Sequence, residues 1–143
     1  MTLDDVTRRG LVLLGCGKMG GAMLQGWLDE GVPREAVHVI DPAPSDWLRA
    51  TGVSLNGPLP EAPAVLMLAV KPQMMDAALP QVADVAGPNT LALSIAAGTP
   101  LARFEAAFPA GTPIVRAMPN LPASVGRGVT ALVANAAAGE VGL

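Results

Sequence analysis

The sequence is poor in several residue types that form cross-links or carry out catalysis. Its 143 residues include one cysteine, one histidine and no tyrosine, with two phenylalanines and two tryptophans. The single cysteine, Cys16, cannot form an internal disulfide, which is typical of proteins in a reducing compartment. No apolar run reaches the roughly 18 residues of a membrane-spanning helix, and residues 1–10 lack the apolar segment of a signal peptide. We therefore expect a cytoplasmic protein with no membrane partner.

Basic residues are also scarce, which argues against nucleic acid as a partner. Lysine and arginine together number 9 against 12 acidic residues, and the formal net charge is −3. Nucleic-acid binding relies on clustered positive charge, and the sequence has no such cluster. No group of histidine, cysteine and acidic residues has the spacing of a metal site, and neither Gly-x-Ser-x-Gly nor Gly-Lys-Ser/Thr occurs. We expect no metal, and acyl-transfer and kinase chemistry are poorly supported.

Apolar residues make up 51% of the sequence and lie in short runs that alternate with helical patterns. Short apolar runs are typical of parallel strands that are buried on both faces. We expect strands over residues 11–14, 37–40, 64–70, 91–95, 113–118 and 128–133, with a brief strand within 51–55. We expect helices between Met19 and Gly31, over 45–50, over 74–85 with a disturbance at Pro80, and over 100–108. This order predicts a doubly wound α/β domain (Rossmann-type) over residues 1–143, with a mostly parallel sheet, helices on both faces and an antiparallel strand allowed at one edge.

A glycine-rich loop follows the first apolar run and precedes the first long helical pattern. It reads Gly15-Cys16-Gly17-Lys18-Met19-Gly20. In a strand–loop–helix unit, the first glycine allows the tight turn, the second leaves room for a phosphate near the backbone, and the third lets the helix lie close to the sheet. The helix N-terminus then suits a pyrophosphate. The context favours dinucleotide binding over an ordinary turn, with Cys16 as a small filler rather than a reactive thiol.

Asp41-Pro42 ends the second expected strand, about 20 residues beyond the glycine loop. An acidic side chain at this point can accept hydrogen bonds from the ribose of adenosine. The alternative is that Asp41 only caps the helix that begins near Ser45. His38 lies within the same strand, and we expect it to have a structural role rather than a catalytic one.

Ligands of open parallel sheets bind outside the carboxyl ends of the strands. The residues at those ends are small, are prolines or belong to the few polar groups of the chain. Both lysines of the sequence, Lys18 and Lys71, fall there, which suggests attraction of an anionic ligand; two solvated lysines are the alternative.

Four segments stand out when taken together: Gly-Cys-Gly-Lys-Met-Gly at 15–20, Ala-Val-Lys-Pro-Gln at 69–73, Ser-Ile-Ala-Ala-Gly at 94–98 and Arg-Ala-Met-Pro-Asn at 116–120. In order and spacing they resemble the pyrroline-5-carboxylate reductase family, which reduces 1-pyrroline-5-carboxylate to L-proline, the last step of proline biosynthesis, by hydride transfer from NADPH or NADH. The first segment is shared by many dehydrogenases, whereas the combination of the other three is more specific. The resemblance implies that residues 15–20 hold the pyrophosphate and that Asp41 and Pro42 meet the adenosine ribose. It further implies that the nicotinamide end is surrounded by Ala69, Val70, Lys71, Pro72, Ala96, Ala97, Gly98, Met118, Pro119 and Asn120.

Two features depart from the family pattern. Leu121 stands where the family usually has threonine, and the chain stops at Leu143 where the family continues into a helical domain that forms the dimer and much of the substrate site. The resemblance therefore implies the cofactor domain of a homo-oligomeric enzyme, with little turnover by this chain, and we assign no catalytic residue. Two other functions stay open: a related β-hydroxyacid or imine reductase, and a stand-alone nucleotide-binding module.

Overall fold

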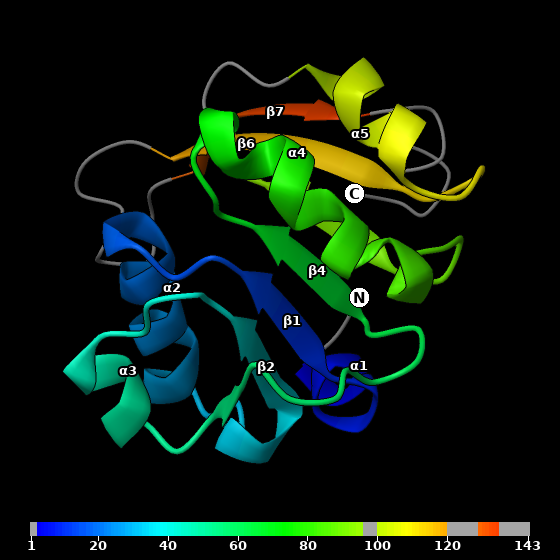
Figure 1. Ribbon diagram of the computed structural model, residues 1–143. Helices are drawn as coiled ribbons and strands as arrows, with labels where there is room; N and C mark the ends of the chain where they lie inside the picture. Colours follow the sequence, from blue (N-terminus) through cyan, green and yellow to red (C-terminus); the bar gives the residue numbers. More distant parts are fainter. Residues whose placement is uncertain (1–2, 96–99, 120–128, 135–143) are drawn as a thin grey trace.

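The computed structural model describes residues 3–95, 100–119 and 129–134. They form a sheet with the strand order β3-β2-β1-β4-β5-β6-β7 (Figure 1). The six strands from β3 to β6 are parallel, and β7 pairs antiparallel with β6 at one edge. The strands are β1 (Leu11–Leu14), β2 (Val37–Ile40), β3 (Ser54–Leu55), β4 (Val65–Leu68), β5 (Leu91–Ser94), β6 (Ile114–Pro119) and β7 (Val129–Ala134). The predicted doubly wound sheet, including its antiparallel edge strand, is confirmed.

The central strand β1 is the point at which the direction of winding reverses. Leu11 pairs with Val37 of β2 on one side and with Val65 of β4 on the other. The chain continues from β1 to β2 and β3 at one edge, and then crosses back to β4 and on to β7. Such a reversal leaves a crevice at the carboxyl ends of the two strands that flank it, which is where ligands of these sheets bind. We therefore expect a ligand site at the carboxyl ends of β1 and β4.

Helices cover both faces of the sheet. The α-helices are α1 (Leu3–Arg9), α2 (Lys18–Asp29), α3 (Asp46–Ala50), α4 (Met75–Ala78) and α5 (Leu101–Ala107), and the 3-10 helices are η1 (Arg34–Ala36), η2 (Pro72–Met74), η3 (Leu79–Gln81) and η4 (Ala83–Val85). Figure 1 shows α2 and α3 beside β1 and β2, with α4 and α5 beside β4 and β6. Leu24 of α2 and Leu48 of α3 belong to one buried cluster, while Met75 of α4 and Phe104 of α5 belong to the other.

The strands supply side chains to both clusters in alternation. In β1, Val12 and Leu14 face the cluster of α4 and α5, whereas Leu11 and Leu13 face that of α2 and α3. All four are buried. Full burial of a large aliphatic side chain contributes about 1.5 to 3 kcal/mol, so both faces contribute to stability. This two-sided burial explains why the strands are continuous apolar runs rather than alternating ones.

One expected helix is corrected by the structure, and one helix is present that was not expected. The stretch expected as a helix over 74–85 is divided into η2, α4, η3 and η4. Pro80 lies in η3 and has no N–H group to continue an α-helix, which accounts for the end of α4 at Ala78 and confirms the disturbance expected at Pro80. The sequence pattern also did not predict α1, which packs the buried Val6 against the sheet and ends where Gly10 N–H donates to Val6 O.

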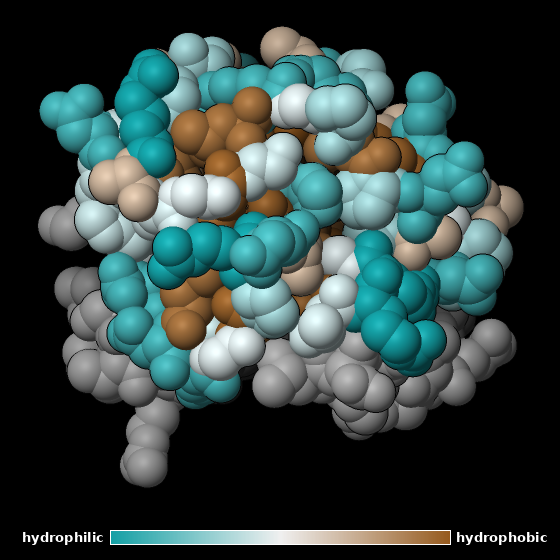
Figure 2. Space-filling view, turned by 90° about the horizontal axis from the view of Figure 1, so that it is seen from below, coloured by the Kyte–Doolittle hydropathy of each residue, from teal (hydrophilic) through white to brown (hydrophobic). Residues whose placement is uncertain are grey.

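Large apolar side chains are little exposed. Of the large apolar residues whose side-chain burial the structure describes, only Trp47 and Met74 are exposed. Figure 2, which views the molecule from below, shows apolar atoms in separate patches interrupted by polar residues. No helix within the described part of the chain is long and apolar enough to cross a membrane.

Candidate functional site

The first and third glycines of the loop between β1 and α2 are required by close packing. Gly15 has φ +84, and a Cβ built on it would lie 2.6 Å from Val70 Cγ1. A Cβ on Gly20 would lie 3.1 Å from Gly15 O and 3.3 Å from Ala69 Cβ. The loop thus lies close against the end of β4, where Ala69 N–H donates to Leu14 O. The loop is therefore a compact turn joined to the two strands that flank the crevice.

The second glycine of the loop is different. Among the described residues, no atom outside the chain neighbours lies within 4 Å of a Cβ built on Gly17, and the backbone of Gly17 is extended, with φ −77 and ψ −158. Gly17 is the N-cap of the 12-residue helix α2, and no side chain caps this helix. The first N–H groups of a helix need acceptors, and the helix dipole favours an anion there. The open space over Gly17 thus lies at a helix end that suits a phosphate group.

Asp41 is joined to the glycine loop by a hydrogen bond. Cys16 N–H donates to Asp41 Oδ2 at 3.1 Å, and Ala43 N–H donates to Asp41 Oδ1 at 2.9 Å. The helix α3 is instead capped by Ser45, whose Oγ accepts from Leu48 N–H at 3.1 Å. The alternative in which Asp41 caps α3 is therefore wrong. The structure places the carboxylate between the glycine loop and the end of β2, at the position expected to meet a ribose.

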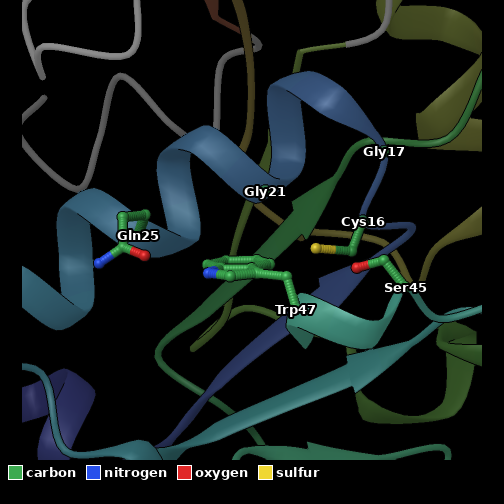
Figure 3. Close-up of a pocket in the computed structure, with 6 residues that line it drawn as sticks. All are labelled: Cys16, Gly17, Gly21, Gln25, Ser45 and Trp47. Atoms are coloured by element: carbon green, nitrogen blue, oxygen red, sulfur yellow. The ribbon is translucent and has the colours of Figure 1, made fainter. Parts of the chain in front are cut away.

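A cleft of about 590 Å³ opens beside the glycine loop, between α2 and α3 (Figure 3). It is lined by Cys16, Gly17, Gly21, Gln25, Ser45 and Trp47. Figure 3 shows the Trp47 indole lying between α3 and α2, with the sulfur of Cys16 directed toward it. A Cβ on Gly21 would lie 3.7 Å from Trp47 Cζ3, an ordinary van der Waals distance, so the indole packs beside the backbone of Gly21. Sequence reasoning did not predict a role for Trp47; its one signal was an aromatic side chain at a helix start in a chain with few aromatics.

The titratable groups near the loop are not set up for nucleophilic chemistry. Burial, and secondarily the negative charge of Asp41, raises the pKa of the Cys16 thiol to about 11. The thiol is therefore protonated at neutral pH and unreactive, as expected of a small filler. Burial lowers the pKa of His38, which is a residue of β2 between Val37 and Val39 and lies away from the carboxyl end of the sheet. Neither side chain offers a catalytic base to the crevice.

The structure brings some of the predicted site residues together and leaves others apart. Residues 15–20, Asp41, Ala69 and Val70 meet at the ends of β1, β2 and β4. Pro42 directly follows Asp41, exposed Lys71 is the N-cap of η2, and Pro72 begins that helix. Met118 and Pro119 end β6, which β4 and β5 separate from β1. Ala96, Ala97, Gly98 and Asn120 lie outside the described residues.

Comparison with known families agrees with this geometry. Residues 10–98, which include the glycine loop and the ends of β1, β2 and β4, match the family described as NADP oxidoreductase, coenzyme F420-dependent. The chain belongs to this family. Curated pyrroline-5-carboxylate reductases also resemble the chain over most of its length, which confirms the resemblance to that group of enzymes.

The curated relatives are about twice as long as this member of the family. The pyrroline-5-carboxylate reductase of Pseudomonas aeruginosa is 34% identical over 132 residues, which cover 88% of this chain and 48% of the relative. That of Haemophilus influenzae is 37% identical over 131 residues, 87% of this chain and 48% of the relative. The chain thus spans about half the length of the curated relatives that it matches, and it is homologous to their N-terminal half.

Solved structures share the fold. The pyrroline-5-carboxylate reductase of Coxiella burnetii superposes with a TM-score of 0.78 at 26% identity, covering 90% of this chain and 50% of that chain. The Plasmodium falciparum pyrroline carboxylate reductase, solved with NADP bound, superposes with a TM-score of 0.73 at 22% identity, covering 91% and 49%. The second likeness concerns the fold alone.

Proposed function

We propose that this chain is the cofactor-binding domain of an enzyme that reduces 1-pyrroline-5-carboxylate to L-proline with NAD(P)H. The observation that carries the proposal is the open space over Gly17 at the uncapped start of α2. A pyrophosphate fits such a place because backbone N–H groups satisfy its oxygens and no side chain obstructs it. Similarity to the N-terminal half of pyrroline-5-carboxylate reductases supports the choice of reaction.

The residues of this chain would bind and orient the cofactor, which supplies the hydride. Gly15 and Gly20 keep the loop tight, Gly17 admits the pyrophosphate, and Asp41 accepts hydrogen bonds from the adenosine ribose. Residues at the ends of β4, β5 and β6 would surround the nicotinamide. Lys71, exposed at the end of β4, adds positive charge beside the anionic cofactor. The resemblance to pyrroline-5-carboxylate reductases implies that a helical half for dimerisation and substrate binding would complete a homo-oligomeric enzyme. The expected cytoplasmic location stays a prediction.

The 143-residue protein is expected to bind NADH or NADPH and to form proline slowly or not at all. Binding follows from the loop and helix geometry, and the low turnover follows from matching only about half the length of the relatives. Calorimetric titration with each dinucleotide, followed by an assay of proline formation, checks both parts. A folded sample that binds neither dinucleotide contradicts the proposed function, and rapid turnover contradicts the expectation that further residues are needed.

The Asp41→Ser variant is expected to bind NADPH about tenfold more tightly than the wild type does, and we propose that the wild type accepts NADH at least as well as NADPH. A carboxylate and a 2′-phosphate about 4 Å apart at a surface repel each other by roughly 1 to 4 kcal/mol. Serine removes that repulsion. Dissociation constants of both dinucleotides for both proteins are the measurement.

A matched control removes a carboxylate far from the loop. Asp84 is exposed in η4, so the Asp84→Ser variant makes the same change of net charge without touching the glycine loop. We expect it to leave both dissociation constants within about twofold of the wild type, because exposed charges separated by more than about 10 Å are largely screened at ordinary salt. Strong preference of the wild type for NADPH, or no gain of NADPH affinity in Asp41→Ser, refutes the proposed role of the carboxylate.

A further inference from the structure

The side-chain amide of Asn56 forms hydrogen bonds with both the backbone N–H and the backbone C=O of Asp41. Asp41 N–H donates to Asn56 Oδ1 at 2.9 Å, and Asn56 Nδ2 donates to Asp41 O at 2.8 Å. The register of β2 and β3 pairs Val39 with Leu55, and Asn56 N–H donates to Val39 O at 2.8 Å. The side-chain amide of Asn56 therefore continues the pairing of β2 beyond the end of β3, in place of another strand residue.

The backbone of Asn56 explains why an asparagine can do this. Asn56 has φ 53, the left-handed conformation, in which the chain turns away from β2. Asparagine adopts this conformation more readily than most non-glycine residues. As the backbone leaves the sheet, the side-chain carboxamide offers one donor and one acceptor to the strand position that the backbone vacates.

Asp41, whose backbone is bonded to Asn56, is in turn hydrogen-bonded to the glycine loop. Its two carboxylate oxygens accept hydrogen bonds from Cys16 N–H and Ala43 N–H, at 3.1 and 2.9 Å. Cys16 and Gly17 line the cleft beside the loop. Three segments distant in sequence are thereby connected in series: the end of β3, the end of β2 and the loop after β1.

We infer that Asn56 is a positioning residue that fixes the Asp41 carboxylate, and so sets both the position of the Cys16 amide and the choice between NADH and NADPH. This inference rests on the proposed function. With Asn56 in place, the negative charge stays where a 2′-phosphate would approach. Without its side chain, the end of β2 gains freedom, and the carboxylate can turn away from the phosphate.

The test compares the wild type with Asn56→Gly, Asp41→Ser and the double variant. Glycine keeps the left-handed backbone accessible and removes only the side chain. Two quantities are measured: the hydrogen-exchange rate of the Cys16 amide in the free protein, and the ratio of the dissociation constants of NADPH and NADH. Thermal unfolding verifies that each variant is folded. Asn89→Gly is the matched control, since Asn89 is an exposed asparagine in the turn before β5, at the amino-terminal end of the sheet.

We expect Asn56→Gly to accelerate exchange of the Cys16 amide and to lower the NADPH-to-NADH ratio by about three- to tenfold, the range for loss of ordinary hydrogen bonds. In the Asp41→Ser background, the same change should leave the ratio unaltered, because the residue through which Asn56 acts is gone. Asn89→Gly should alter neither quantity.

Different failures separate the two claims. If Asn56→Gly weakens NADH and NADPH equally, or leaves both unchanged, while Asp41→Ser shifts the ratio, the inference is overturned and the proposed function stands. If Cys16 exchange is the same in the wild type and in Asn56→Gly, the inference is likewise overturned. If folded wild type binds neither dinucleotide, the proposed function fails and the inference fails with it.

Discussion

Replacing Gly17 by valine is expected to weaken dinucleotide binding by at least about a hundredfold, equivalent to roughly 2.7 kcal/mol, while leaving the fold intact. Within the described residues, no atom outside the chain neighbours lies within 4 Å of the Cβ position at Gly17, so a Cβ fits there without a clash. The backbone of Gly17 is extended, which valine adopts readily. The branched side chain would fill the place that we assign to the pyrophosphate and would shield the N–H groups at the start of α2.

Two measurements separate binding from stability in this variant. Urea unfolding should show a loss of no more than about 2 kcal/mol in the free energy of unfolding, because valine is a much poorer N-cap than glycine. Calorimetric titration should show the loss of affinity. Gly87→Val is the matched control, because Gly87 also has no atom within 4 Å of its Cβ position but lies just before β5, away from the loop. Normal binding by Gly17→Val would mean that the pyrophosphate does not pass over this backbone.

Replacing Gly15 by alanine should destabilise the fold, whereas the Gly17 substitution mainly weakens binding. We expect Gly15→Ala to lose roughly 3 kcal/mol in the free energy of unfolding. A left-handed backbone costs an alanine about 1 to 2 kcal/mol, and Gly15 has φ +84. The new Cβ would also lie 2.6 Å from Val70 Cγ1 and 3.1 Å from the backbone N of Val70. The valine side chain can move, but the backbone of the segment after β4 is held by the sheet, so overpacking adds about 1 to 3 kcal/mol.

The same substitution at Gly111 provides the control for Gly15→Ala. Gly111 has φ +85, but its Cβ would meet only Pro88 Cγ at 3.6 Å, an ordinary contact. Gly111→Ala should therefore cost only the strain of the backbone, about 1 to 2 kcal/mol. Urea unfolding of both variants measures the difference, which is the contribution of the crowding between the glycine loop and the end of β4. Equal losses in the two variants would show that this crowding is not what requires glycine at position 15.

Local patterns were sufficient to predict the sheet. The runs that became β1 and β4 are apolar at every position because helices cover both faces, and this requirement is visible without knowing which helices they are. Helices were harder. The apolar spacing of 74–85 is helical, but Pro80 divides the stretch into short pieces. The seven residues of α1 bury too few side chains to leave a periodic signal, and packing of Val6 against the sheet stabilises it.

The sequence by itself determined which segments follow one another along the chain: an apolar strand, a glycine loop, a helix, and an acidic residue after the next strand. These features follow from short-range rules of backbone conformation and burial, which depend on neighbouring residues. The glycine pattern assigned a role to each of the three glycines, but only the tertiary structure supplied the neighbours, such as Val70 after β4, which crowds Gly15. It also decided that Asp41 holds Cys16, 25 residues away, and is itself held by Asn56. These hydrogen bonds join segments that are distant in sequence, and they form because the sheet brings the strand ends together. A local sequence pattern cannot predict them.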